Sequence, residues 1–191
     1  MKQNERRLIE IVRENEMIVK VLDILQELKD APNCYLGAGA ITNTIWNYLS
    51  NYPLTYGISD IDIVYFNSGH LEPEYEETIR IELISKLGNF PYKLDVKNQA
   101  RVHLWYEKKF GFPIKPYTSV EDAINSWPTT ATALGMRKEE NDIYKIYSPY
   151  SLDDLFSMIV RPNKRMITRE IFEVKAAKWK SKWPELTIIS W

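Results

Sequence analysis

The chain has 191 residues, of which 45% are hydrophobic and 27% are charged, a composition typical of a folded globular protein and unlike that of a disordered or collagen-like chain. Its 25 Lys and Arg residues against 26 Asp and Glu residues leave a net charge of −1, so the whole chain has no electrostatic attraction to nucleic acid or to an anionic membrane. The single cysteine excludes an intrachain disulfide, and no apolar run is long enough for a signal peptide or a membrane span. We therefore expect a cytoplasmic protein without a membrane partner.

The first half of the chain begins with an amphipathic stretch. Apolar residues at helical spacing over residues 5–29 predict one N-terminal helix, which Pro32 ends. A short apolar strand over residues 34–36 enters a glycine-rich turn, and a helix follows directly. A loop over residues 49–57 leads to the clearest strand, at residues 58–66, which is β-branched and aromatic with period-two alternation.

The second half alternates segments that favour helix with segments that favour strand. Helices are predicted over residues 72–87, 98–109, 120–127, 152–159 and 164–182. Further strands are predicted over residues 92–96, 130–136 and 143–147. This pattern indicates an α+β protein that folds as one compact domain. Within it we distinguish an N-terminal amphipathic helix packed on the core (1–30), an α/β core (31–150) and a C-terminal helical segment (151–191).

Two acidic residues inside the strand at 58–66 are unusual for a strand interior. Side chains two residues apart point to the same face, so Asp60 and Asp62 present their carboxylates together. Two such charges about 4 Å apart repel by about 4 kcal/mol at an effective dielectric of about 20, and Mg²⁺, which prefers oxygen ligands, would neutralise them. Asp95, in a later short strand, is expected beside them as a third ligand. The alternative is a solvated strand edge that binds no metal.

The glycine-rich turn is the second candidate feature. Gly37, Ala38 and Gly39 follow a strand and open a helix, so their amides and the helix N-terminus can hold a phosphate. Such a turn is also common as a plain connection. Lys97 and Arg101 are candidates for a clamp on the same phosphates, and the alternative for both is a solvated helix face that balances nearby acids.

In this order, the features resemble the nucleotidyltransferase superfamily, which shares its fold with DNA polymerase beta. Residues 36–39, the Asp60-Ile61-Asp62 strand and Asp95 carry the resemblance. Residues 36–40, 60–66 and 96–105 also resemble a group of bacterial nucleotidyltransferase-like proteins. The implied fold is a mixed sheet of about five strands flanked by helices, with a C-terminal helical addition.

The resemblance also implies an activity. Asp60, Asp62 and Asp95 would be the catalytic and metal-binding residues for Mg²⁺ or Mn²⁺, and Asp95 would help to activate an acceptor hydroxyl. A nucleoside triphosphate would bind at Gly37, Ala38, Gly39, Lys97 and Arg101. The enzyme would transfer a nucleoside monophosphate to a small-molecule or protein hydroxyl and release pyrophosphate.

Three alternatives stay open at this point. The first is a catalytically silent relative that serves as a nucleotide-sensing or protein-interaction module. The second takes Asp60-Ile61-Asp62 as the metal-binding motif of a sugar-nucleotide glycosyltransferase. The third is a nucleic-acid acceptor, which the net charge disfavours without excluding it.

The C-terminal helix expected at residues 164–182 is rich in Lys and Arg. A solvated basic face is the favoured interpretation, and a nucleic-acid-binding face is the alternative. Its apolar stripe is expected to consist of Ile167, Ile171, Val174 and Ala177. The aromatic side chains of Trp179, Trp183 and Trp191 are interpreted as core anchors or as a homo-oligomer contact rather than as a base-stacking platform.

Overall fold

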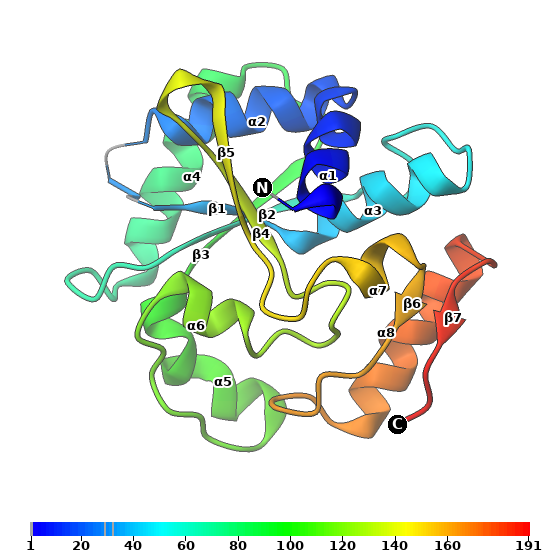
Figure 1. The fold of residues 1–191 in the computed structure, drawn as a ribbon. Coiled ribbons are helices and arrows are strands. Elements are labelled where there is room, and N and C mark those ends of the chain that lie inside the picture. Colours follow the sequence, from blue (N-terminus) through cyan, green and yellow to red (C-terminus); the bar gives the residue numbers. More distant parts are fainter. Residues whose placement is uncertain (1, 29, 32) are drawn as a thin grey trace.

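A computed structural model describes residues 2–28, 30–31 and 33–191. Its central sheet has five strands in the spatial order β3-β2-β1-β4-β5 (Figure 1). The strands are β1 (Tyr35–Gly37), β2 (Asp60–Tyr65), β3 (Lys93–Asn98), β4 (Gly135–Glu139) and β5 (Ile143–Tyr147). β2 and β3 are parallel and the other neighbouring pairs are antiparallel. The expected mixed α+β sheet flanked by helices is therefore confirmed.

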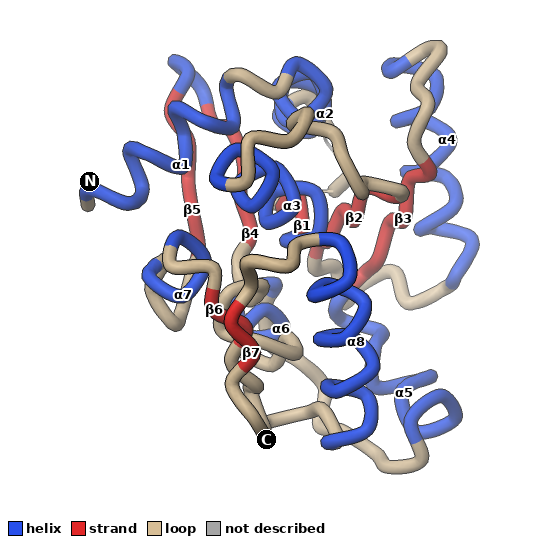
Figure 2. Tube along the Cα trace, turned by 90° about the vertical axis from the view of Figure 1, so that its right-hand side faces the viewer, coloured by secondary structure: helices blue, strands red, loops and turns tan. Residues whose placement is uncertain are grey.

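Eight α-helices are described around this sheet. They are α1 (Gln3–Arg13), α2 (Glu16–Gln26), α3 (Ala38–Leu49), α4 (Pro73–Leu87), α5 (Val102–Phe110), α6 (Val120–Ile124), α7 (Asp153–Phe156) and α8 (Arg169–Lys182). Both views place α2 above the central strands and α5, α6 and α8 below them (Figures 1 and 2). None of the helices in the described part of the chain is long and apolar enough to cross a membrane.

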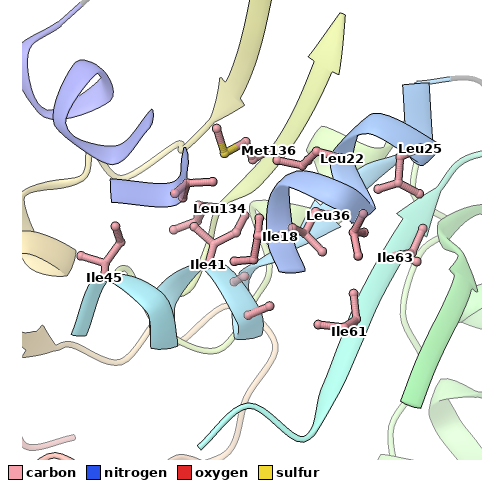
Figure 3. Packing of buried hydrophobic residues seen from close by; sticks show 14 of the residues in the cluster. Ile18, Leu22, Leu25, Leu36, Ile41, Ile45, Ile61, Ile63, Leu134 and Met136 are labelled. Atoms are coloured by element: carbon pink, nitrogen blue, oxygen red, sulfur yellow. The ribbon is translucent and has the colours of Figure 1, made fainter. Parts of the chain in front are cut away.

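The core lies between the sheet and the helices α2 and α3. Ile61 and Ile63 of β2 are completely buried and face the side that these two helices cover (Figure 3). Ile18 of α2 and Ile41 of α3 are also completely buried in this cluster. The alternation of β2 therefore leaves its acidic residues on the other side of the sheet.

The N-terminal prediction of one helix is wrong, because the stretch forms the two helices α1 and α2. Asn15 lies at the break, and its buried side-chain amide donates to Thr44 Oγ1 at 2.9 Å and to the Leu54 carbonyl at 3.3 Å. A buried polar group needs such partners, so it orients the chain at this point. The expected end of the helix falls on Lys29 and Pro32, which lie outside the described residues.

The loop predicted at residues 49–57 is confirmed, since no regular element is described between α3 and β2. Asn47 of α3 fixes this loop, because its side-chain amide donates to the Leu54 carbonyl at 3.0 Å and to the Tyr56 carbonyl at 2.8 Å. The strand predicted at 130–136 is mostly a turn, and only Gly135 and Met136 enter β4. A hydrogen bond between the hydroxyls of Thr129 and Thr132 holds that turn.

Two boundaries change in the second half of the core. The strand predicted at 92–96 extends to Asn98, and the helix predicted at 98–109 becomes a short 3₁₀ turn (Gln99–Arg101) followed by α5. The helix predicted at 120–127 is the shorter α6. The helix predicted at 72–87 corresponds to α4, and the strand predicted at 143–147 is β5.

The C-terminal segment combines helices with a small sheet. The predicted helix at 152–159 shortens to α7, because Ile159 and Val160 form β6, which pairs in parallel with β7 (Thr187–Ile188). The helix expected from residue 164 begins at Arg169, after the Thr168 hydroxyl accepts a hydrogen bond from the Ile171 amide.

The apolar stripe predicted for the C-terminal helix is only partly right. Ile167 is buried and Ile171 packs against the core, but Val174 and Ala177 are exposed. Val174 is 71% exposed, whereas Phe172 and Ala176 are buried. The helix turns this face inward because Trp183, at its end, is completely buried and its ring contacts Trp46 edge-on. Trp183 is therefore a core anchor, as predicted.

Candidate active site

The candidate site is on the face of the sheet opposite the main core. Asp60 is exposed at the start of β2, and Asp62 is half-buried further along the strand. Asp62 is the register partner of Asp95 in the parallel strand β3, while Asp60 pairs with Lys93. Register partners on neighbouring strands project to the same face, so the three predicted carboxylates share one surface.

The three acids are coupled electrostatically. The pKa of Asp62 is raised to about 6, first by burial and then by the negative charges of Asp60 and Asp95, while Lys175 and Lys97 act in the opposite direction. A carboxyl group that is both desolvated and close to like charges disfavours ionisation. Its ionised form is therefore costly unless a positive charge binds beside it.

The glycine turn lies directly against Asp62. A Cβ built on Gly37 would lie 3.0 Å from Asp62 Cβ, and one built on Gly39 would lie 3.3 Å from Asp62 Oδ2. Both approaches follow from the antiparallel pairing of β1 with β2, in which Leu36 is the partner of Ile63. The absence of side chains at the two glycines is what allows the turn to approach the carboxylate.

The turn also opens α3. Gly37 is the residue before the first helical turn, and no side chain caps it. The first backbone amides of a helix have no partner within the helix, and the helix dipole makes this end positive. The positive end of α3 therefore lies beside the acidic face of β2.

A cavity of about 400 Å³ opens beside Asp62. The start of α3 contributes one wall, at Gly39 and Thr42, and other walls come from Trp105 of α5 and Lys175 of α8. Thr42 is only 1% exposed, and its Oγ1 has no hydrogen-bond partner among the described residues. Elements far apart in the sequence thus meet around one acidic residue.

A family model described as nucleotidyltransferase matches residues 25–188. The chain belongs to the nucleotidyltransferase family. A solved NMR structure described as revealing a CCA-adding enzyme head domain is 26% identical, with a TM-score of 0.79 over 97% of this chain and 96% of that one. No curated protein matches the chain.

Membership of this family confirms the expected nucleotidyltransferase fold and the expected class of activity, nucleotidyl transfer. The recognised motifs at residues 36–39 and Asp60-Ile61-Asp62 fall inside the matched region. The family and the structural similarity place the chain among transferases that move nucleotidyl groups. The glycosyltransferase interpretation of the two acids has no support from either comparison.

The donor types of this nucleotidyltransferase fit a divalent metal, since Mg²⁺ and Mn²⁺ prefer carboxylate oxygens. In the described conformation, however, no group of three or more His, Cys, Asp or Glu is arranged to hold a metal ion within the described ranges. Asp60 Oδ1 accepts from the Ser59 hydroxyl at 2.6 Å, and Asp95 Oδ1 lies 3.0 Å from Lys97 Nζ. The acids therefore share a face while two of them are engaged by protein partners.

The two predicted basic residues have different positions. Lys97 is beside the site, where its ammonium pairs with Asp95. Arg101 is not at the cavity, because its guanidinium pairs with Glu76 at 3.0 Å and donates to the Leu71 carbonyl at 3.1 Å. Both partners of the Arg101–Glu76 pair are largely buried, which favours a structural role for this arginine.

The sequence patterns missed several residues that line the cavity. They are Thr42, Trp105, Trp127, Lys175 and Trp179. Trp179 was expected in the core or at an oligomer contact, and Lys175 on a solvated face. Residue type was the signal that the sequence offered for these positions. For Lys175 and Trp179, the face that α8 turns toward the sheet depends on packing between distant segments, which helical spacing does not show.

Proposed function

We propose that the protein is a metal-dependent nucleotidyltransferase that transfers a nucleoside monophosphate from a nucleoside triphosphate to a hydroxyl group of a small molecule or protein, with release of pyrophosphate. One observation carries this proposal. Asp62, whose pKa is raised first by burial and then by Asp60 and Asp95, lines a cavity of about 400 Å³ together with the uncapped start of α3. Negative and positive elements thus flank one cavity, as a triphosphate with its metal requires.

Asp60, Asp62 and Asp95 would hold Mg²⁺ or Mn²⁺, which supplies charge neutralisation at the phosphoryl oxygens. The backbone amides of Gly39 and the following residue of α3 bind phosphate oxygens. Lys97 holds the carboxylate of Asp95 in place and adds positive charge to the phosphate region. These residues contribute position and electrostatics rather than covalent chemistry.

The transfer replaces one bond at the α-phosphorus with another. The acceptor oxygen forms a bond to the α-phosphorus, and the bond from that phosphorus to the bridging oxygen of pyrophosphate breaks. Asp95 accepts the proton of the acceptor hydroxyl, because its carboxylate shares the face of Asp62. Pyrophosphate leaves with its own negative charge toward the α3 N-terminus.

The aromatic wall of the cavity supports a nucleotide as the ligand. Trp105 and Trp127 both line it, and an indole ring offers a flat apolar surface for a base. Such stacking tolerates any of the four bases, because each has a π-face. A nucleic-acid acceptor stays the less favoured choice, given the net charge of −1.

The test is release of pyrophosphate from each of the four ribonucleoside triphosphates, with Mg²⁺ or Mn²⁺ and with water as the fallback acceptor. The proposal predicts slow formation of nucleoside monophosphate and pyrophosphate that is lost in Asp62→Asn and in EDTA. The matched control is Asp153→Asn, because Asp153 is an exposed acid that does not line the cavity. Nucleotide binding without any pyrophosphate would support the catalytically silent module instead.

A further inference from the structure

The C-terminal helix brings one unpaired ammonium group to the cavity. Lys175 of α8 lines the cavity together with Gly39 and Asp62. No ion pair or hydrogen bond joins its ammonium to any of the described residues. The two basic residues that the sequence indicated differ in this respect, because Lys97 pairs with Asp95 and Arg101 pairs with Glu76.

Lys175 feels the charges of both the acidic and the basic residues of the site. Desolvation is the largest influence and lowers its pKa, and the positive charges of Lys178 and Lys109 lower it further. Asp62 and Asp60 act in the opposite direction. Lys175 is exposed as a whole residue, but its ammonium lies at the cavity without a direct partner, so a phosphate bound there can accept its hydrogen bonds.

The position of Lys175 is fixed by the core contacts of the same helix. Trp183 follows about two helical turns later, is completely buried, and its Nε1 donates to Asn47 Oδ1 at 2.9 Å. Lys182 Nζ donates to the Gly57 carbonyl at 2.9 Å. These contacts hold α8 against α3 and the loop that follows it, so Lys175 is held at the cavity rather than carried there by a mobile tail.

The α3 wall offers a second unpartnered group. The hydroxyl of Thr42 is buried, lines the cavity and has no hydrogen-bond partner within the described part of the chain. A threonine in a helix commonly donates to the carbonyl four residues earlier, as Thr44 Oγ1 does to the Ala40 carbonyl at 2.9 Å. Thr42 does not, which leaves its hydroxyl free to donate to a bound anion.

We propose that Lys175, from the C-terminal helix, binds the phosphate chain of the nucleotide together with the Thr42 hydroxyl at the start of α3. This inference rests on the proposed function for the identity of the ligand. It assigns the cationic phosphate contact to a residue outside the recognised motifs and makes α8 part of the site. Charge-assisted hydrogen bonds from lysine to phosphate are among the stronger polar contacts.

The experiment compares full-length wild type, Lys175→Met and Lys178→Met by calorimetric titration with inorganic tripolyphosphate, ATP, CTP and adenosine in the presence of Mg²⁺. Lys178 is exposed on the same helix, as Lys175 is, but it does not line the cavity, so it controls for the loss of one positive charge. We expect Lys175→Met to weaken tripolyphosphate and nucleotide binding by about tenfold or more, as loss of a charged hydrogen bond does. Lys178→Met should change these affinities less than threefold, and adenosine binding should respond to neither.

A second variant keeps the charge. Lys175→Arg should restore most of the lost affinity. Thr42→Val should weaken binding about threefold to tenfold and leave the salt dependence of binding as in the wild type, whereas loss of the Lys175 charge should make that dependence shallower. Equal binding by wild type and Lys175→Met, or equal losses in Lys175→Met and Lys178→Met, would overturn the inference alone. Failure of the wild type to bind any phosphate ligand would overturn the proposed function as well. Binding without pyrophosphate release would support the Lys175 contact but contradict catalysis.

Discussion

Gly37 lies against Asp62 so closely that a Cβ added to it would come within 3.0 Å of Asp62 Cβ and 3.2 Å of the Asp62 carbonyl oxygen. Neither atom can move without moving β2, because one belongs to the backbone and the other is attached to it. The glycine turn and the acidic strand are therefore one structural unit. Their juxtaposition joins the proposed phosphate-binding turn to the proposed metal-binding acids.

Gly37→Ala tests this unit. We expect the added methyl group to displace β1 from β2 and to lower the free energy of unfolding by about 1–3 kcal/mol, the usual cost of overpacking. It should also weaken metal-dependent nucleotide binding. Gly69→Ala is the control, since its Cβ would meet only the side-chain oxygen of Asn67 at 3.3 Å in an exposed turn, and it should stay within about 0.5 kcal/mol of wild type in urea denaturation.

Asp62→Asn should stabilise the free protein at neutral pH. Because the folded pKa of about 6 lies above the ordinary value of 3.8, ionised Asp62 destabilises the fold, and this cost develops as pH rises through the interval between the two values. We expect the variant to gain up to about 3 kcal/mol of unfolding free energy at pH 7.5 without metal, because the shift spans about two pKa units and each unit corresponds to about 1.4 kcal/mol. The gain should shrink toward zero near pH 4. Lower stability of the variant at pH 7.5 would contradict this electrostatic account.

Arg101→Met should damage stability rather than nucleotide affinity. The side chains of Arg101 and Glu76 are only 14% and 10% exposed, so removal of the arginine leaves a carboxylate buried without its ion-pair partner. We expect a loss of about 3 kcal/mol in unfolding free energy, with the nucleotide dissociation constant of the folded protein changed less than twofold. Arg80→Met removes an exposed pair with Glu77 and should cost about 0.5 kcal/mol or less. A large loss of affinity in Arg101→Met would restore the phosphate-clamp interpretation.

Asn15→Ala should weaken the junction of α1 and α2. The buried amide donates to Thr44 Oγ1 and to the Leu54 carbonyl, and both acceptors would lose a partner. We expect a destabilisation of about 1–3 kcal/mol in thermal or urea unfolding. Asn4→Ala removes an exposed hydrogen bond to Asp153 and should have little effect.

Local patterns were sufficient to predict much of the sheet and of its acidic face. The period-two alternation of β2 placed Ile61 and Ile63 in the core and their acidic neighbours on the other side, and the structure shows the same alternation. The turn after β1 was equally local, because glycine next to a strand end permits a close approach that other residues do not. The order of these elements then carried the family resemblance.

The parts that were not predicted depend on contacts between distant segments. The face of α8 is set by Trp183 packing on Trp46, so helical spacing alone placed Val174 in the core, whereas the structure leaves it 71% exposed. The break at Asn15 depends on partners in α3 and the following loop. Arg101 looked free in sequence because its partner, Glu76, comes from another helix.

Metal-dependent nucleotide binding at Asp62 is tested most directly by thermal unfolding. The wild type and Asp62→Asn are titrated with each nucleoside triphosphate, with and without Mg²⁺ or Mn²⁺. A ligand that binds only the folded state raises the unfolding temperature by mass action. We expect stabilisation of the wild type that requires both nucleotide and metal, and no stabilisation of Asp62→Asn. Equal stabilisation of the two proteins, or no response of the wild type to any nucleotide with metal, would contradict it.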